Sequence, residues 1–414
     1  MKFKKYIISM IAFAAASDAI LIPFYPQFFN LRYGIASAAH VGIYVAAISI
    51  AVMSALPFWA SFARRLEPLK LLMWTQLAAG AFSLASIWAP TVVWYWGLSM
   101  LMFMCKSSYL LLYPYLMRLT HKGNHARTVG VISVVMYVGT ISGTLAGGFV
   151  LQTWGPLGTI MVMAAGDFMQ MAVCVYLLCS KIMLSSRTSS ASDIGMVSAI
   201  SEPVVRRVRL PILRLALVML TFDFGCFVIR PFFSMRWQMI SDQGSEIVSS
   251  IVFAIPGMLA LIALSVNSWV SKRHGRLSGH IGGNLLFGVV GLLMQAASDP
   301  ALVVVGRCIY GWTVFQIAVK LEVNLFRLSS PKYYAEDYAV MNLFQNFGVL
   351  LSSFAAGSIV DLFGFYAPFL VGAAAFILAG VLYRLILKIP SVIHMEEAER
   401  RVPRYHIKAS NHAN

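Results

Sequence analysis

Residues 6–28 read YIISMIAFAAASDAILIPFYPQF, an apolar run that contains a single charged residue, Asp18. A helix needs about 20 predominantly apolar residues to cross the hydrocarbon core of a bilayer, so this run is long enough to span. Pro23 and Pro26 free backbone carbonyls and bend the helix, as expected where backbone lines a cavity. We therefore expect a retained membrane span here, not a cleaved leader.

The second half of the chain repeats this pattern. Three residues recur 205 positions later: Asp18, Pro26 and Phe28 as Asp223, Pro231 and Phe233. Further matches recur with shifts of 208 or 209: Arg64-Arg65 as Lys272-Arg273, and Gly139 and Gly148 as Gly348 and Gly357. Two parallel repeats predict a pseudo-two-fold axis along the membrane normal, with a site between the halves.

Composition extends the membrane interpretation to the whole chain. Of the 414 residues, 59% are hydrophobic and 12% are charged, whereas soluble domains have roughly 25% charged residues. Apolar runs fall at 6–28, 38–62, 69–89, 91–117, 128–153, 158–181, 211–235, 247–270, 279–297, 300–322, 336–360 and 366–389. Runs this long and continuous are helices, which predicts an all-α membrane protein with about twelve spans.

The basic residues indicate topology. Of the 32 Lys and Arg residues, 27 fall in the termini, the central linker and alternate loops. This positive-inside pattern predicts that both termini are cytoplasmic, in a bacterial inner membrane. We expect four segments: a six-helix bundle at 1–181, a cytoplasmic linker at 182–210, a second bundle at 211–389 and a cytoplasmic tail at 390–414. The net charge of +16 does not form the basic, aromatic-rich surface that nucleic acid requires.

Two local motifs strengthen the pattern. Span 5 has four glycines in G-x-x-x-G-x-x-x-G-G spacing, Gly139, Gly143, Gly147 and Gly148. Such spacing gives a helix a smooth face that a neighbouring helix can approach closely. The loop after span 8 reads Lys272-Arg273-His-Gly275-Arg276; it is either a gating element or a basic loop that sets topology.

With these motifs the chain resembles the major facilitator superfamily. The span 5 glycines are similar to a motif of its drug and metabolite exporters, with Thr144 in place of the proline. The loop keeps the R-x-G-R part of a family motif, although Lys272 replaces its acidic residue. The resemblance implies two six-helix bundles around a central cavity lined by spans 1, 4, 7 and 10.

Charges in the spans are the first candidates for function, because an ionised side chain in a bilayer is costly. The candidates for proton coupling or substrate binding are Asp18, Lys106, Asp223, Arg230 and Arg307, with Tyr25 and Tyr109 beside them. Alternatives stay open: Asp18 and Lys106 could form a fixed ion pair, the arginines could reach the interface, and the tyrosines could serve packing. For Asp167 in span 6 we expect structural hydrogen bonding.

These observations predict proton-coupled efflux of a small organic compound, with uptake of an anionic nutrient such as an organic acid as the alternative. A membrane-embedded enzyme or receptor is a weaker possibility, because the sequence has no phosphate-binding loop and no H-E-x-x-H or G-x-S-x-G motif. The five cysteines form no C-x-x-C pair. We expect a non-enzymatic monomer without metal or cofactor, whose partners are the substrate, protons and membrane lipid.

Overall fold

The structure is a computed structural model that describes residues 2–112, 115–116, 125–180, 210–241, 244–274, 281–329 and 334–387. Within these ranges every regular element is helical. The all-α fold predicted from the sequence is therefore confirmed for the described part of the chain.

The N-terminal half contains helices of unequal length and three short 3-10 turns. Its elements are α1 (Lys2–Ala19), η1 (Ile22–Phe24), α2 (Tyr25–Tyr33), α3 (Ala38–Arg65), α4 (Pro68–Ala85), η2 (Ser86–Trp88), α5 (Val92–Lys106), η3 (Ser107–Leu111) and α7 (His125–Cys179). Within α7, Gly155 has a φ of 69°, a left-handed conformation that favours glycine. Because Pro156 follows, α7 bends there and crosses twice, as the two apolar runs at 128–153 and 158–181 predict.

The C-terminal half has the same plan. Its elements are α9 (Leu210–Phe227), α10 (Phe233–Ile240), α11 (Glu246–His274), α12 (Ile281–Ala296), α13 (Pro300–Leu328), α14 (Tyr334–Phe363) and α15 (Ala367–Leu387). Nine segments of the described chain are long and apolar enough to span a membrane, and α7 counts among them as one. With the bend in α7, the broken helix α5–η3 and the shorter apolar helix α12, the described helices account for all twelve predicted crossings.

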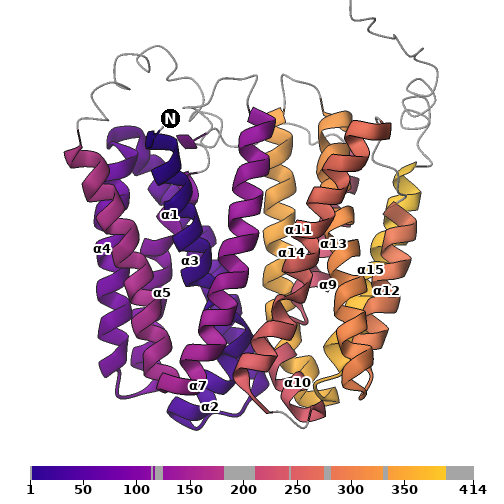
Figure 1. Ribbon diagram of the computed structural model, residues 1–414, viewed down its shortest axis with the longest axis horizontal. Helices are drawn as coiled ribbons and strands as arrows, with labels where there is room; N and C mark the ends of the chain where they lie inside the picture. The colour runs from indigo at the N-terminus through magenta and orange to yellow at the C-terminus, as the bar shows by residue number, and fades with distance from the viewer. Residues whose placement is uncertain are drawn as a thin grey trace, which may run out of the picture.

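The two halves stand side by side, the first in indigo to magenta and the second in orange to yellow (Figure 1). We name the end where α7 finishes and α9 begins the linker side, and the end where α2 and α10 lie the distal side. The halves meet along two seams, where α3 packs on α14 and α7 packs on α11. In the internal repeat, α3 corresponds to α11, and the first part of α7 corresponds to α14. The pseudo-two-fold axis therefore relates the α3–α14 seam to the α11–α7 seam. The pseudo-two-fold arrangement is thus visible in the packing.

Both seams depend on glycine. A Cβ added at Gly148 would lie 2.6 Å from the carbonyl oxygen of Glu246, and one added at Gly42 would lie 2.7 Å from that of Ser353. Gly357, the repeat equivalent of Gly148, approaches the backbone of Ala38 in the same way. Close approach of backbones without intervening side chains is a common way for helices to associate in lipid.

On the distal side, each seam has a side chain that caps the first turn of the opposite helix. Asp361 at the end of α14 accepts hydrogen bonds from the backbone N–H groups of Ala38 (3.1 Å) and Ala39 (2.8 Å). Gln152 in α7 accepts from the Ser245 hydroxyl (2.7 Å) and the Ile247 N–H (3.3 Å). Asp361 and Gln152 lie 209 positions apart, the shift of the internal repeat. They satisfy backbone donors that a helix start leaves without partners.

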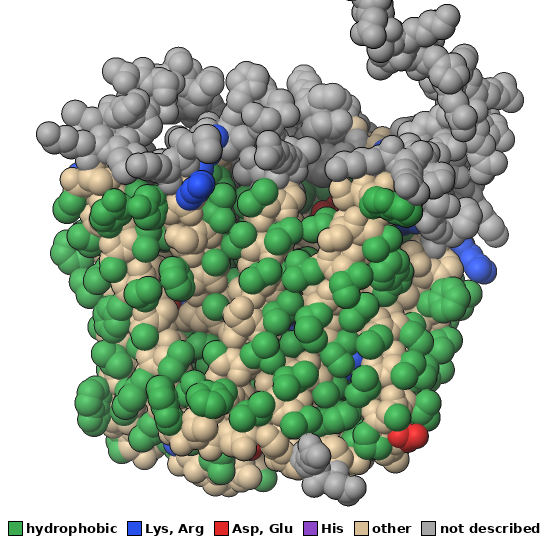
Figure 2. All heavy atoms as spheres, viewed as in Figure 1, with side chains coloured by type: hydrophobic (Ala, Val, Ile, Leu, Met, Phe, Trp, Pro, Cys, Tyr) green, Lys and Arg blue, Asp and Glu red, His purple; other side chains and the backbone are tan. Residues whose placement is uncertain are grey.

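The outer face suits a lipid environment. Figure 2 shows hydrophobic side chains over most of the visible flank, with charged side chains mainly near the two ends. Large apolar residues remain exposed there, among them Phe287 (63%) and Leu286 (59%). Exposure of this extent costs free energy in water and none in hydrocarbon, so the flank is the surface that contacts the bilayer.

The predicted smooth face on span 5 packs on α1. Gly139, Gly143 and Gly147 each bring α7 against α1, where added Cβ atoms would meet the backbone oxygens of Ala12, Ala16 and Ile20. Gly148 points instead to α11. The glycines therefore hold α7 between the first helix of its own half and a helix of the other half.

We expect Gly143→Ala to destabilise the protein by about 1–3 kcal/mol, the usual range for overpacking, because its methyl group would overlap the Ala16 carbonyl. Gly97 in α5 is the matched control, since nothing lies within 4 Å of an added Cβ there. Thermal unfolding of the two purified variants in detergent checks this. Equal melting temperatures would show that α1 and α7 do not need this contact.

Candidate functional site

The first helix, α1, ends one residue after Asp18. Pro23 cannot donate to the carbonyl of Ala19, so α1 ends there and the chain continues through η1 into α2. Asp18 thereby lies in the last turn of α1, in the interior of the bundle, and its side chain is 26% exposed. The break leaves the carboxylate accessible within an otherwise buried segment.

Lys106 lies at a second helix break. α5 ends at Lys106 and continues as the 3-10 turn η3. A 3-10 helix has three residues per turn, so positions i and i+3 face the same way. Lys106 and Tyr109 therefore both face α1. The Lys106 carbonyl, freed at the break, accepts a hydrogen bond from Gln76 Nε2 at 3.4 Å.

Three oxygen atoms surround the Lys106 ammonium. Its Nζ lies 3.1 Å from Asp18 Oδ1 and 3.0 Å from Asp167 Oδ1, and it donates a hydrogen bond to Ser17 Oγ at 2.8 Å. The Tyr109 hydroxyl donates to Asp18 Oδ2 at 2.8 Å. We call these five residues, Ser17, Asp18, Lys106, Tyr109 and Asp167, the Lys106 cluster.

Accessibility within the Lys106 cluster is unequal. The Lys106 side chain is 2% exposed and that of Asp167 is 0% exposed, against 26% for Asp18. A buried ion is tolerated when partners compensate its charge. Lys106 and Asp167 form such a pair in the protein interior. Of the three charged side chains in the cluster, that of Asp18 is the most exposed.

The charge balance of the cluster leaves one site for a cation. Two carboxylates face one ammonium, so the fully ionised cluster carries a net charge of −1. Carboxylates that share a site do not titrate independently, and such a group binds a proton as a unit. The Lys106–Asp167 pair is neutral by itself, and Asp18 supplies the excess negative charge.

The sequence predicted part of this cluster. Asp18, Lys106 and Tyr109 are brought together, and the ion pair kept open as an alternative for Asp18 and Lys106 is present. Asp167, for which hydrogen bonding was expected, forms an ion pair with Lys106. The sequence feature that pointed to Asp167 was a charged residue within an apolar span. Nothing in the sequence pointed to Ser17 except that it precedes Asp18.

The second half places Asp223 in the equivalent position with different partners. Asp223 lies one turn before the end of α9, and its Oδ2 is buried without a hydrogen-bond partner among the described residues. Arg230 and Glu322 lie within electrostatic range of it. Glu322 on α13 has an exposed side chain and was not among the sequence candidates, although it falls at the end of the predicted span at 300–322.

Two further groups connect this region to the other half. Tyr137 of α7 lies within electrostatic range of Arg230 and Glu322, and its ring contacts Phe315 of α13 with a centroid distance of 6.1 Å. The guanidinium of Arg230 stacks on Phe227 at 3.7 Å, a cation–π contact. The acidic groups of the second half thus lie near the surface where the halves meet.

Arg307 serves a different purpose in this structure. Pro256 in α11 has no N–H for the carbonyl of Val252, its partner in a regular helix. Arg307 of α13 supplies the missing donor, with Nε at 3.3 Å from the Val252 oxygen and Nη2 at 2.5 Å from that of Phe253. Its guanidinium also lies 4.0 Å from the ring centroid of Phe233. Arg307, 3% exposed, therefore binds α11 to α13.

Tyr25 belongs to an aromatic group on the distal side. Its ring contacts Tyr44 edge to face with a centroid distance of 5.1 Å, and it is 3% exposed. The group also includes Phe28, Phe29, Tyr33 and Tyr95. Tyr25 lies within electrostatic range of Asp18, so it packs between the aromatic group and the Lys106 cluster.

The residues of the basic loop are described only in part. Arg273 lies in the last turn of α11, while Gly275 and Arg276 fall outside the described residues. Their proposed gating role stays a prediction.

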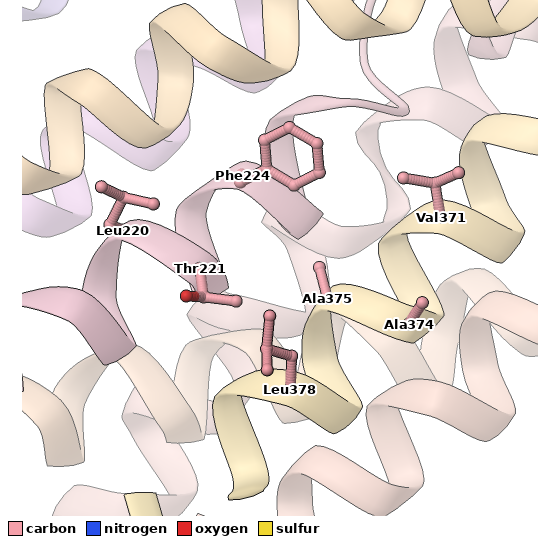
Figure 3. Close-up of a pocket in the computed structure, with 7 residues that line it drawn as sticks. All are labelled: Leu220, Thr221, Phe224, Val371, Ala374, Ala375 and Leu378. Atoms are coloured by element: carbon pink, nitrogen blue, oxygen red, sulfur yellow. The ribbon is translucent and has the colours of Figure 1, made fainter. Parts of the chain in front are cut away.

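An apolar crevice of about 330 Å³ opens between α9 and α15 (Figure 3). Its lining residues are Leu220, Thr221, Phe224, Val371, Ala374, Ala375 and Leu378. The Thr221 hydroxyl donates to the carbonyl of Leu217 within its own helix. With no polar group directed into it from this lining, the crevice fits an acyl chain better than a polar substrate.

Comparisons with known proteins agree with this architecture. The family model of the Major Facilitator Superfamily matches residues 215–409. The crystal structure of the nucleoside transporter NupG is similar, with a TM-score of 0.70 and 13% identity over 94% of this chain and 100% of that chain. So is a bacterial homologue of the human lysosomal transporter Spinster in an inward-facing and occupied conformation. Its TM-score is 0.72, with 11% identity over 93% and 96% of the two chains. No curated protein sequence matches the chain significantly.

The described chain is a bundle of long apolar helices in two related halves, with charges compensated in its interior. The solved structures establish the fold over almost the whole chain, and the family model identifies the second half by sequence. Residues 215–409 are similar to the major facilitator superfamily by sequence, and the fold of the chain is similar to that of the two solved transporters.

We expect Arg307→Met to lower stability by about 1–3 kcal/mol, the cost of leaving a buried carbonyl without a donor. Pro256→Ala gives α11 an N–H for the Val252 carbonyl, so Arg307→Met should cost less in that background. The melting temperatures of the unsubstituted protein, the two single variants and the double variant give a double-mutant cycle. Strictly additive effects would show that Arg307 does not compensate for Pro256.

Proposed function

We propose that the chain is a proton-coupled secondary transporter that exports a small organic compound. The observation that carries this proposal is the Lys106 cluster, in which two carboxylates share one buried ammonium and one of the carboxylates is accessible. Net charge in a membrane interior is costly. A proton bound at Asp18 would neutralise this net charge. We therefore expect Asp18 to bind a proton when the site is open to the side of the membrane with the higher proton concentration.

The cluster also lies where a conformational change would act on it. Asp18 is on α1, and α1 packs on the glycine face of α7, which in turn packs on α11 of the other half. A movement of α7 along the seam with α11 would change the position of Asp167 relative to Asp18 on α1 and Lys106 on α5. Proton binding at Asp18 would then favour one arrangement of the halves over the other.

Export is the direction that the span 5 glycines support, through their similarity to exporters of the family. Uptake of an anionic nutrient would draw on Lys106, Arg230 and Arg307 as anion contacts. In the structure, Lys106 is compensated by carboxylates and Arg307 binds the carbonyls of α11. Of the three basic residues, only Arg230 is then left as a candidate to bind an anionic substrate. Export is therefore the better-supported proposal.

Direction can be measured without knowing the substrate. Deleting the gene from its host should raise the concentration of the exported compound inside cells and lower it in the medium. An untargeted comparison of metabolites in cells and medium, with and without the gene, provides this measurement. Depletion inside the deletion strain would instead indicate uptake.

Coupling is tested with the compound that the comparison identifies. Asp18→Asn should abolish transport driven by an imposed pH gradient in proteoliposomes, because the amide cannot exchange a proton in this range. Asp299→Asn is the matched control, since Asp299 only caps α13 through Ala301 and asparagine caps equally well. Gradient-driven flux that persists in Asp18→Asn would exclude Asp18 as the coupling residue.

A further inference from the structure

Ser17 occupies an unusual place beside the Lys106 cluster. It is 2% exposed, precedes Asp18 in α1, and accepts the hydrogen bond of the Lys106 ammonium at 2.8 Å. Its own hydroxyl hydrogen is donated to the carbonyl of Met163 in α7 at 3.0 Å. Ser17 therefore connects Lys106 to a backbone atom that has a fixed position.

We propose that Ser17 is a positioning residue that keeps Lys106 charged and in place while Asp18 gains and loses its proton. This inference rests on the proposed function, because it assigns a role within the same coupling site. Ser17 acts through Lys106 and does not itself exchange a proton.

The role of Ser17 depends on how the three N–H donors of the ammonium group are used. Lys106 Nζ has three hydrogens, and three oxygens surround it. When Asp18 is protonated, one anionic partner becomes neutral, and Lys106 retains Asp167 and Ser17. Ser17 therefore contributes more to the protonated cluster than to the ionised one. Its loss should weaken proton binding.

Glycine at position 166 makes this geometry possible. A Cβ added at Gly166 would lie 2.8 Å from the Cβ of Ser17 and 3.0 Å from its hydroxyl oxygen. A side chain there would displace Ser17 from Lys106. Two different positions, on α1 and α7, thus control the same hydrogen bond.

The titratable groups that face Lys106 and Asp18 come from three segments. Asp167 is on α7, Tyr109 is on η3, and Tyr25 follows the break in α1. From α4 the neighbouring group is the Gln76 amide, which does not titrate. Ser17 also lies against Asp167, so the comparison with Ser17→Thr, which keeps the hydroxyl, assigns a change in proton binding to that hydroxyl.

The experiment is a pH titration of the purified full-length protein in lipid, followed by the infrared carbonyl band of a protonated carboxyl. The proton is the probe, so no substrate is required. Ser17→Ala should move the midpoint of the band to lower pH by about one unit, as expected when a hydrogen bond to a charged group is lost. Other carboxyls, such as Asp223, contribute to this band, so the Asp18 component is the difference between the spectra of the unsubstituted protein and of Asp18→Asn.

A matched serine controls for packing. Ser83 of α4 is 1% exposed and donates to the carbonyl of Ile160 in the same helix α7. Ser83→Ala should leave the midpoint unchanged. Ser17→Thr keeps the hydroxyl and should restore the original midpoint, and Gly166→Ala should shift the midpoint in the same direction as Ser17→Ala.

The outcomes separate this inference from the function on which it rests. Equal midpoints for Ser17→Ala and Ser83→Ala, with an Asp18 component present in the difference spectrum, would overturn the role of Ser17 and leave proton binding at Asp18 intact. Identical spectra for Asp18→Asn and the unsubstituted protein would overturn the proton site itself. Should Ser17→Ala fail to fold, an unshifted midpoint in Gly166→Ala would overturn the inference.

Discussion

The structure depends on compensating one ammonium group in the interior of a membrane bundle. Lys106 is placed by the change from α-helix to 3-10 helix at the end of α5, and its charge is met by Asp18 on α1 and Asp167 on α7. Three segments that are far apart in the sequence must therefore keep a fixed geometry at this point. The glycine face of α7 allows that geometry because it lets α1 approach without intervening side chains.

The two halves share a backbone plan and differ in their charges. Asp18 and Asp223 occupy equivalent positions before a helix break, yet only the first has a lysine partner among the described residues. In the second half a buried cation is Arg307, which donates to the Val252 carbonyl freed by Pro256 and to the neighbouring Phe253 carbonyl. Repeat symmetry thus fixes where helices break and meet, while the charged residues differ between the halves: the first has the Lys106 cluster, and the second has Asp223 near Arg230 and Glu322.

Much of the fold was predictable because spans depend on length and apolarity, which are local properties. The bend at Gly155 was also predictable, since glycine and proline interrupt helices through their own backbone chemistry. Asp18 and Lys106 could be selected because a charge in an apolar run is conspicuous. Tyr109 follows Lys106 by one 3-10 turn, but the turn itself leaves no clear mark in the sequence. Asp167, Glu322 and the role of Arg307 depend on which helices pack together, and no periodicity in one span carries that information.

The caps on the distal side have a consequence for how the halves would separate. Asp361 holds the start of α3 with a full negative charge, and Gln152 holds the start of α11 with a neutral amide. A carboxylate gains more from the positive end of a helix dipole than an amide does. Two seams that look alike in shape are therefore unequal in strength. If the halves separated on the distal side, the contact between α7 and α11 would therefore break before the contact between α3 and α14.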